Sequence, residues 1–238
     1  MTAASPAARR GGQQGGPPLL APALAFAALT IAGVALSARS PQPAASAASV
    51  LSYVRSHHAF MLVAGFLEFA AAAPLAIWTA TAYRRQRTLG VTAPGAVIGL
   101  AGGLLAAASL ALSGLISWTI AQVSGSVDGG LARALADLSF ATGAAGFVVP
   151  LGLLVAGLAV PGLILGLLPR WLAWTGLVLA AVSELSAFSL LTSVLDVTLP
   201  AGRFGGLLWL VAASVLLPRS RRDLRATAPA PAAARAGS

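Results

Sequence analysis

Long runs of apolar residues alternate with short polar segments along most of the chain, and this pattern predicts helices that cross a lipid bilayer. Crossing about 30 Å of hydrocarbon takes about 20 residues, because an α-helix rises 1.5 Å per residue. The apolar runs that approach or exceed this length cover residues 19–36, 59–83, 93–123, 139–168, 171–195 and 199–217. We therefore expect an all-α fold, a polytopic bundle of about six membrane-spanning helices.

The two ends of the chain differ in composition from the apolar region between them. Residues 1–18 are rich in Ala, Gly, Gln and Pro, and residues 219–238 are basic and then rich in Ala and Pro. Neither segment can bury enough apolar surface to form a core. We expect a disordered N-terminal tail over 1–18, a six-helix domain over 19–218 and a basic, disordered C-terminal tail over 219–238.

The first apolar run leaves two alternatives open. It follows two arginines and ends in Ala35-Leu36-Ser37, a pattern that also suits a cleaved signal peptide. Its apolar stretch is longer than the ~7–15 residues usual in signal peptides, so we expect a retained helix. Cleavage would leave five spans without changing the sides of the others.

Several features predict departures from six plain helices. Residues 50–55 and 131–138 read as short helical lead-ins to the second and fourth spans. Pro74, Pro150 and Pro161 lie inside spans, and each lacks the backbone N–H that a regular helix uses. Glycines at a spacing of four, Gly99/Gly103 and Gly162/Gly166, are expected to serve ordinary packing between helices of this chain.

The charge of the chain is distributed as in a membrane protein. Only 9% of its residues are charged, whereas a soluble domain has about 25%. The net charge is +9, and all 15 basic residues are arginines that lie mainly at the ends of apolar runs rather than in one patch. This distribution argues against nucleic acid as a partner and favours the lipid bilayer with its anionic headgroups.

The arginines also predict the orientation. With the N-terminus inside, eleven of them fall in the cytoplasm and four on the outer side. The four outer ones are Arg39, Arg55, Arg133 and Arg203. The positive-inside rule favours this orientation, so we expect a multi-pass protein of the cell membrane with both termini in the cytoplasm. Four arginines that follow the last span are expected to contact lipid headgroups, at about 1 kcal/mol each: Arg219, Arg221, Arg222 and Arg225.

Two carboxylates lie inside predicted spans, Glu68 in the second and Glu184 in the fifth. An ionised carboxylate at mid-depth costs at least ~2.5–3.5 kcal/mol, so it normally faces the interior of a bundle or water. Residues three and four positions away are mostly Ala and Gly around both glutamates, which predicts that each lies between packed helices. No arginine is expected at mid-depth to pair with them. They are candidates for a proton or cation site, or for protonated groups that only support packing.

The two histidines, His57 and His58, are predicted at the outer mouth of the second span. They lie about ten residues before Glu68, or ~15 Å along a helix, which is too far for contact. The favoured interpretation is a polar cap at the membrane interface. The alternative is a group that senses external pH or admits protons.

Patterns that carry catalytic chemistry are absent from the sequence. The chain has no cysteine, and its two histidines are adjacent, which excludes thiolate metal sites and two-histidine clamps from separate segments. There is no G-x-S-x-G elbow, H-E-x-x-H helix, Walker loop or G-x-G-x-x-G turn. We therefore expect no catalytic residues, no metal and no cofactor, and a protein that is not an enzyme.

The segment Leu168–Val178, Leu-Pro-Arg-Trp-Leu-Ala-Trp-Thr-Gly-Leu-Val, resembles a recurrent feature of small integral membrane proteins of actinobacteria. In those proteins a Leu-Pro-Arg-Trp-Leu turn opens the fifth helix and a Leu-Trp-Leu run lies in the last one, as Leu208–Leu210 does here. The resemblance implies a six-helix layout with a Pro/Ala-rich first external loop. That family is a domain of unknown function, so it implies no catalytic residues.

Two functions from different classes are consistent with these patterns. The leading expectation is a non-enzymatic membrane protein, an accessory or assembly factor that acts with a membrane-protein partner or a second copy of itself. The alternative is a small proton-linked transporter or permease that uses Glu68 and Glu184. A wet cavity that reaches either glutamate would favour transport, whereas a dry bundle would favour the accessory role.

Overall fold

The computed structural model describes residues 18–41, 45–220 and 223, and within these ranges it is helical and contains no strand. The α-helices are α1 (Leu20–Ser37), α2 (Ala47–Ser56), α3 (His58–Leu89), α4 (Gly95–Gln122), α5 (Gly129–Gly143), α6 (Ala145–Ile164), α7 (Arg170–Leu185) and α8 (Thr198–Leu216). Two 3-10 helices, η2 (Ser186–Leu190) and η3 (Ser193–Val197), connect α7 to α8. The predicted all-α bundle is confirmed, whereas nearly all of the two predicted tails lies outside the described residues.

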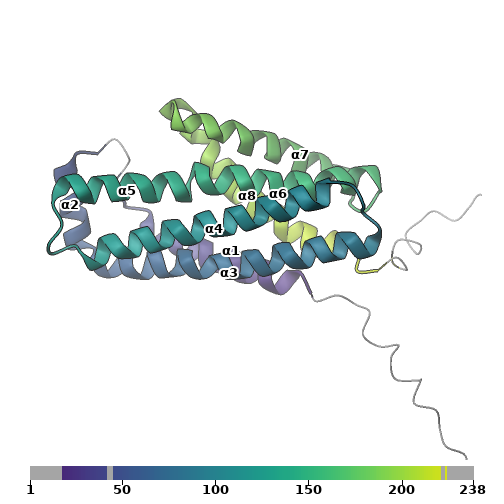
Figure 1. Ribbon diagram of the computed structural model, residues 1–238, viewed down its shortest axis with the longest axis horizontal. Helices are drawn as coiled ribbons and strands as arrows, with labels where there is room; N and C mark the ends of the chain where they lie inside the picture. Colours follow the sequence, from purple (N-terminus) through teal and green to yellow (C-terminus); the bar gives the residue numbers. More distant parts are fainter. Residues whose placement is uncertain (1–17, 42–44, 221–222, 224–238) are drawn as a thin grey trace, which may run out of the picture.

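Six helical stretches of the described chain are long and apolar enough to cross a membrane, with α5 and α6, α7 and η2, and η3 and α8 each counted together. They coincide with the six predicted runs, so the fold is that of a multi-pass helical bundle. The start of α1, the end of α8 and the α3–α4 turn lie toward the same end of the bundle (Figure 1). This arrangement follows from an even number of crossings, which returns the chain to the side where it began.

The helices differ in length, and the longest ones exceed the thickness of the hydrocarbon core of a bilayer. The 32 residues of α3 span ~48 Å and the 36 residues of α5 with α6 span ~54 Å, compared with ~30 Å of hydrocarbon. At the end opposite the α3–α4 turn, α2 and the first half of α5 reach beyond the point where α7 turns back (Figure 1). We call this end the cap. It has its own apolar cluster, formed by Val50, Val54, Ile120, Val127 and Ala132.

The predicted lead-ins and the predicted fifth span are refined by the structure. Residues 50–55 belong to a separate helix, α2, and residues 131–138 belong to α5. The fifth span was expected to continue to residue 195, but α7 ends at Leu185. The hydroxyl of Ser186 lies 3.0 Å from the carbonyl of Val182 and 2.8 Å from the hydroxyl of Thr198. Such side-chain bonds compete with regular helix bonding, and here they accompany the change to 3-10 turns.

Glycines let the central helix α4 lie directly against α3 and α6. A Cβ atom on Gly114 would lie 2.5 Å from the backbone nitrogen of Phe69 and 2.6 Å from the carbonyl oxygen of Gly65, both in α3. Gly99 of α4 packs in the same way against Gly157 of α6. Small residues allow such close approach between membrane helices. The predicted packing role of Gly99 and Gly103 is confirmed.

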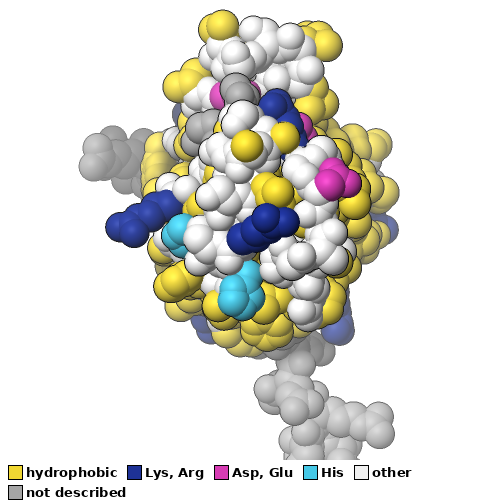
Figure 2. All heavy atoms as spheres, turned by 90° about the vertical axis from the view of Figure 1, so that its left-hand side faces the viewer, with side chains coloured by type: hydrophobic (Ala, Val, Ile, Leu, Met, Phe, Trp, Pro, Cys, Tyr) yellow, Lys and Arg dark blue, Asp and Glu magenta, His cyan; other side chains and the backbone are white. Residues whose placement is uncertain are grey.

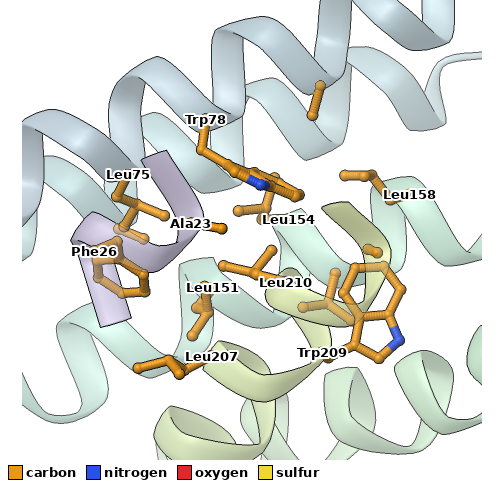
Figure 3. Close-up of a cluster of buried hydrophobic side chains, with 14 of the residues drawn as sticks. Ala23, Phe26, Leu75, Trp78, Leu151, Leu154, Leu158, Leu207, Trp209 and Leu210 are labelled. Atoms are coloured by element: carbon orange, nitrogen blue, oxygen red, sulfur yellow. The ribbon is translucent and has the colours of Figure 1, made fainter. Parts of the chain in front are cut away.

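The half of the bundle nearest the α3–α4 turn is packed with apolar side chains (Figure 3). Trp78, Leu154 and Leu210 meet there, each at most 1% exposed. The indole N–H of Trp78 donates to the hydroxyl of Ser214 at 2.7 Å, so its one polar atom is satisfied. Nearer the turn, two buried polar side chains follow on α3, Arg85 and Gln86, and the amide of Gln86 donates to the carbonyl oxygen of Gly157 at 3.0 Å.

Candidate polar cavity

A cavity of about 520 Å³ lies between α1, α3, α4, α5 and α8, on the cap side of the apolar core. Its mouth lies at the end of α1 and beside η3, where Ser37, Tyr53 and Asp196 contribute to the lining. The deeper polar residues come from five different helices, which places side chains far apart in the sequence around one space. These residues are Thr30, Glu68, Ser113, Ser117, Ser139 and Arg203.

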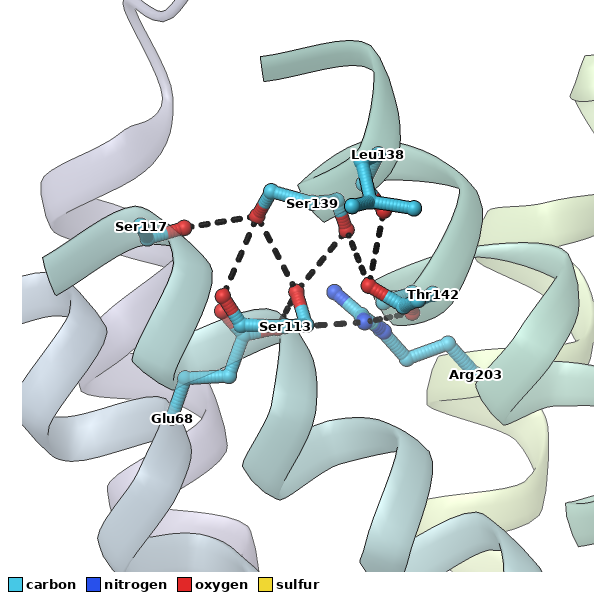
Figure 4. A network of polar contacts seen from close by, with 8 residues as sticks. Glu68, Ser113, Ser117, Leu138, Ser139, Thr142 and Arg203 are labelled. Carbon is cyan, nitrogen blue, oxygen red and sulfur yellow. Dashed lines mark hydrogen bonds and ion pairs between the residues drawn. The ribbon is translucent and has the colours of Figure 1, made fainter. Parts of the chain in front are cut away.

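The floor of the cavity is a network of hydroxyl, carboxylate and guanidinium groups (Figure 4). The Ser113 hydroxyl lies 3.2 Å from Oε1 of Glu68 and 2.9 Å from the carbonyl oxygen of Ser139, and both are acceptors for its single proton. The hydroxyls of Ser139 and Ser117 lie 2.7 Å apart. The network therefore connects α3, α4 and α5 through groups that can rearrange their protons without moving the backbone.

The break between α5 and α6 supplies part of this floor. Ala144 has φ −90° and ψ −98°, which interrupts the fourth span within the membrane domain. The guanidinium of Arg203 donates through Nη2 to the carbonyl oxygen of Gly143, next to the break. Backbone groups at membrane depth must find partners within the protein, and this bond provides one. A Cβ atom on Gly143 would collide with the Ser113 hydroxyl and lie 3.0 Å from Oε1 of Glu68.

Arg203 overturns the expectation that no arginine would pair with either glutamate. It had been counted among the four arginines of the outer side, which stays a prediction. The structure places it on the second turn of α8, with Nη2 3.9 Å from Oε1 of Glu68 and only 20% of its side chain exposed. Its guanidinium carbon lies 5.2 Å from the ring centre of Phe147, within the range of a cation–π contact. The sequence did contain one sign that Arg203 lies inside the bundle, because it stands four residues inside the predicted 199–217 run.

The two glutamates occupy different environments. Glu68 lies between packed helices as predicted, with 23% of its side chain exposed, and it lines the cavity. Glu184 was expected in the same kind of position, but this is wrong, because it is exposed on α7. A Cβ atom added at Gly152 of α6 would lie 3.5 Å from the Oε1 atom of Glu184. Glu184 has no hydrogen bond or ion pair with the described residues. Small neighbours at three and four positions are present around both, so they do not distinguish the two positions.

The two histidines lie in the cap, at the junction of α2 and α3, and are visible in Figure 2. The His57 ring stacks on Tyr53 with 4.5 Å between ring centres, and its Nδ1 atom lies 2.8 Å from the Ser56 hydroxyl. His58 is exposed. Neither lines the cavity that contains Glu68, and both interpretations, a polar cap and a group that senses external pH or admits protons, stay predictions.

The basic residues after the last span are described only in part. Arg219 is exposed immediately beyond α8, and its backbone N–H donates to Oδ2 of Asp223 at 3.1 Å. Arg221, Arg222 and Arg225 lie outside the described residues. Their contacts with lipid headgroups therefore stay a prediction.

Within the described chain, no three His, Asp or Glu side chains come together as a group that could hold a metal ion. Comparisons with protein-family models, with curated proteins and with solved structures find no match. The chemistry of the cavity floor is therefore interpreted from its own groups: one carboxylate, one guanidinium and three serine hydroxyls.

Proposed function

We propose that the protein is a small, non-enzymatic permease of the cell membrane that links the movement of a solute to a proton on Glu68. The observation that supports this most directly is the 520 Å³ cavity that reaches Glu68 and Arg203. Small-molecule sites commonly have volumes of about 300–1,000 Å³ with a few convergent polar groups among apolar walls. An ionisable residue in a membrane domain that faces such a cavity marks a solute or proton pathway.

The break at Ala144 fits the same proposal. In secondary transporters, solute sites lie where a membrane helix is interrupted, because the irregular backbone can face the cavity instead of lipid. Here the interruption lies beside the Glu68–Arg203 pair, and the apolar core around Trp78 closes the space on the other side. In the proposed cycle, this closed half opens when the cap side closes, with α5 and α6 moving at their junction.

One observation favours the accessory role as a second candidate. Glu184 is exposed on α7, where Trp174, Val178 and Leu185 are also more than half exposed. A carboxylate on an apolar, lipid-facing surface is costly, and a membrane-protein partner or a second copy of the chain could cover it. The accessory role does not require a water-filled cavity, whereas transport does. Access of water-soluble reagents to the cavity therefore distinguishes the two roles.

The proposed orientation is tested by reporter fusions. A reporter that is active only in the cytoplasm is expected to be active after Thr92, in the exposed α3–α4 turn, and after Ser238. The same reporter is expected to be inactive after Ser126, in the α4–α5 turn of the cap. The physical reason is the excess of arginine on one side of the bundle. Activity after Ser126, or inactivity after Thr92, would reverse the proposed orientation.

Alternating access is tested by cysteine labelling, which is straightforward because the native chain contains no cysteine. Ser117→Cys places a thiol on the cavity wall, and Ser214→Cys places one in the apolar core beside Trp78. In vesicles, a membrane-impermeant maleimide is expected to label the first variant when added on either side, and to label the second only when added on the cytoplasmic side, where the core around Trp78 opens. Labelling from the cap side alone would contradict transport. Labelling from neither side would favour the accessory role.

A further inference from the structure

We infer that the solute is a small organic monoanion with an apolar body, which binds Arg203 through its carboxylate while Glu68 takes up one proton. This inference rests on the proposed permease function and specifies the substrate class of that site. It involves no redox or covalent step: a proton passes from water to the Glu68 carboxylate, and the guanidinium of Arg203 exchanges one carboxylate partner for another.

The guanidinium of Arg203 has unused donors. Arginine carries five N–H groups, and the contacts of Arg203 with Glu68 and with the Gly143 carbonyl both use Nη2. Its Nε and Nη1 atoms have no acceptor among the described residues. A guanidinium presents its N–H groups as a planar fork that matches two carboxylate oxygens, so the free donors suit a carboxylate ligand.

The pair between Arg203 and Glu68 is also loose. Its single N–O contact of 3.9 Å exceeds the ~2.7–2.9 Å of a charge-assisted hydrogen bond. Glu68 has a second partner in the Ser113 hydroxyl, which can donate to the charged carboxylate or accept from the protonated one. Protonation of Glu68 therefore removes the attraction on Arg203 without leaving the carboxyl group unpaired.

Charge balance couples the anion at Arg203 to a proton on Glu68. Glu68 and Arg203 together carry no net charge, so an anion alone would leave the site negative and a cation alone would leave it positive. An anion together with a proton on Glu68 keeps the site neutral, which a low-dielectric environment favours. The other titratable groups on the cavity wall are Asp196 of η3 and Tyr53 of α2, both near the mouth; α1, α4, α5 and α6 contribute none among the described residues.

The walls above the floor define the rest of the solute. They are apolar side chains, one from each of seven helices: Val34, Val54, Met61, Leu110, Phe140, Val148 and Phe204. A volume of about 520 Å³ exceeds what a bare carboxylate needs, so an aliphatic or aromatic body fits above the polar floor.

The test uses three probes that share one body and differ in charge: 3-phenylpropanoate, phenylalanine and phenethylamine. Binding to the full-length protein in nanodiscs is measured by calorimetry at pH 5.5 and pH 8, in buffers of different ionisation enthalpy. We expect 3-phenylpropanoate to bind best, to take up about one proton per anion, and to lose up to about tenfold in affinity per pH unit as pH rises. Tighter binding of phenylalanine or phenethylamine, anion binding without proton uptake, or no binding by any probe would each overturn the inference.

Two variants and a control assign the effect to the pair. Glu68→Gln mimics the protonated carboxyl, so it is expected to bind 3-phenylpropanoate equally at both pH values and without proton uptake. Arg203→Gln is expected to lose anion binding at both pH values, with folding verified by helical circular dichroism and thermal unfolding. Arg55→Gln, in the cap, is expected to behave as the native protein. If Ser117→Cys is labelled from both sides but these binding results fail, the permease proposal survives and only the substrate class is wrong.

Discussion

Gly114→Ala is expected to destabilise the bundle by about 3 kcal/mol, the upper part of the range for overpacked cores. The new methyl group would lie 2.5 Å from the Phe69 nitrogen and 2.6 Å from the Gly65 carbonyl oxygen. Both are backbone atoms of α3, so relief requires two helices to separate rather than one side chain to rotate. The measurement is thermal unfolding of the purified protein, followed by circular dichroism.

Gly125→Ala is the matched control for this substitution. Gly125 lies in the α4–α5 turn, and a Cβ atom added there would have no neighbour within 4 Å. Its stability is expected to differ from that of the native protein by less than about 0.5 kcal/mol, as for most surface substitutions. Equal stability of the two variants would show that α3 and α4 are not in close contact at Gly114.

Arg203→Leu is expected to cost about 3 kcal/mol at pH 8, at the low end of the range for breaking a buried ion pair. It leaves the Glu68 carboxylate without its cation and the Gly143 carbonyl without its donor. The loss is expected to shrink at pH 5, because the isolated carboxylate can then take up a proton. Unfolding in detergent at the two pH values measures both effects.

The double variant Glu68→Gln/Arg203→Leu separates the two contributions. Removing the charge of Glu68 is expected to recover most of the stability lost at pH 8 and to abolish the pH dependence. Asp137→Asn, which disrupts the exposed Arg133–Asp137 pair in the cap, is a control expected to cost at most about 1 kcal/mol. A double variant as unstable as Arg203→Leu at pH 8 would show that the lost Gly143 bond, rather than the ion pair, is the main effect.

The comparison of Glu68 and Glu184 shows what a local sequence pattern can and cannot predict about burial between helices. Both have small residues at the helical neighbour positions, and both were expected between helices. Only Glu68 lies there, since its face of α3 packs on α4, whereas Glu184 lies on the exposed side of α7. A helix face of small residues allows close packing, but it does not determine which helix packs against it, or whether any does.

The sequence by itself determined the all-α fold and the six spans, because a helix must stay apolar for about 20 residues to cross hydrocarbon. It also determined that Glu68 would be a rare polar group in an apolar region. Only the tertiary structure decided that Arg203 meets Glu68, that the fourth span breaks at Ala144, and that a cavity surrounds them. These features depend on which faces of α3, α5 and α8 turn toward one another. Helix–helix contacts far apart in the chain set those rotations, and neither hydropathy nor local spacing records them.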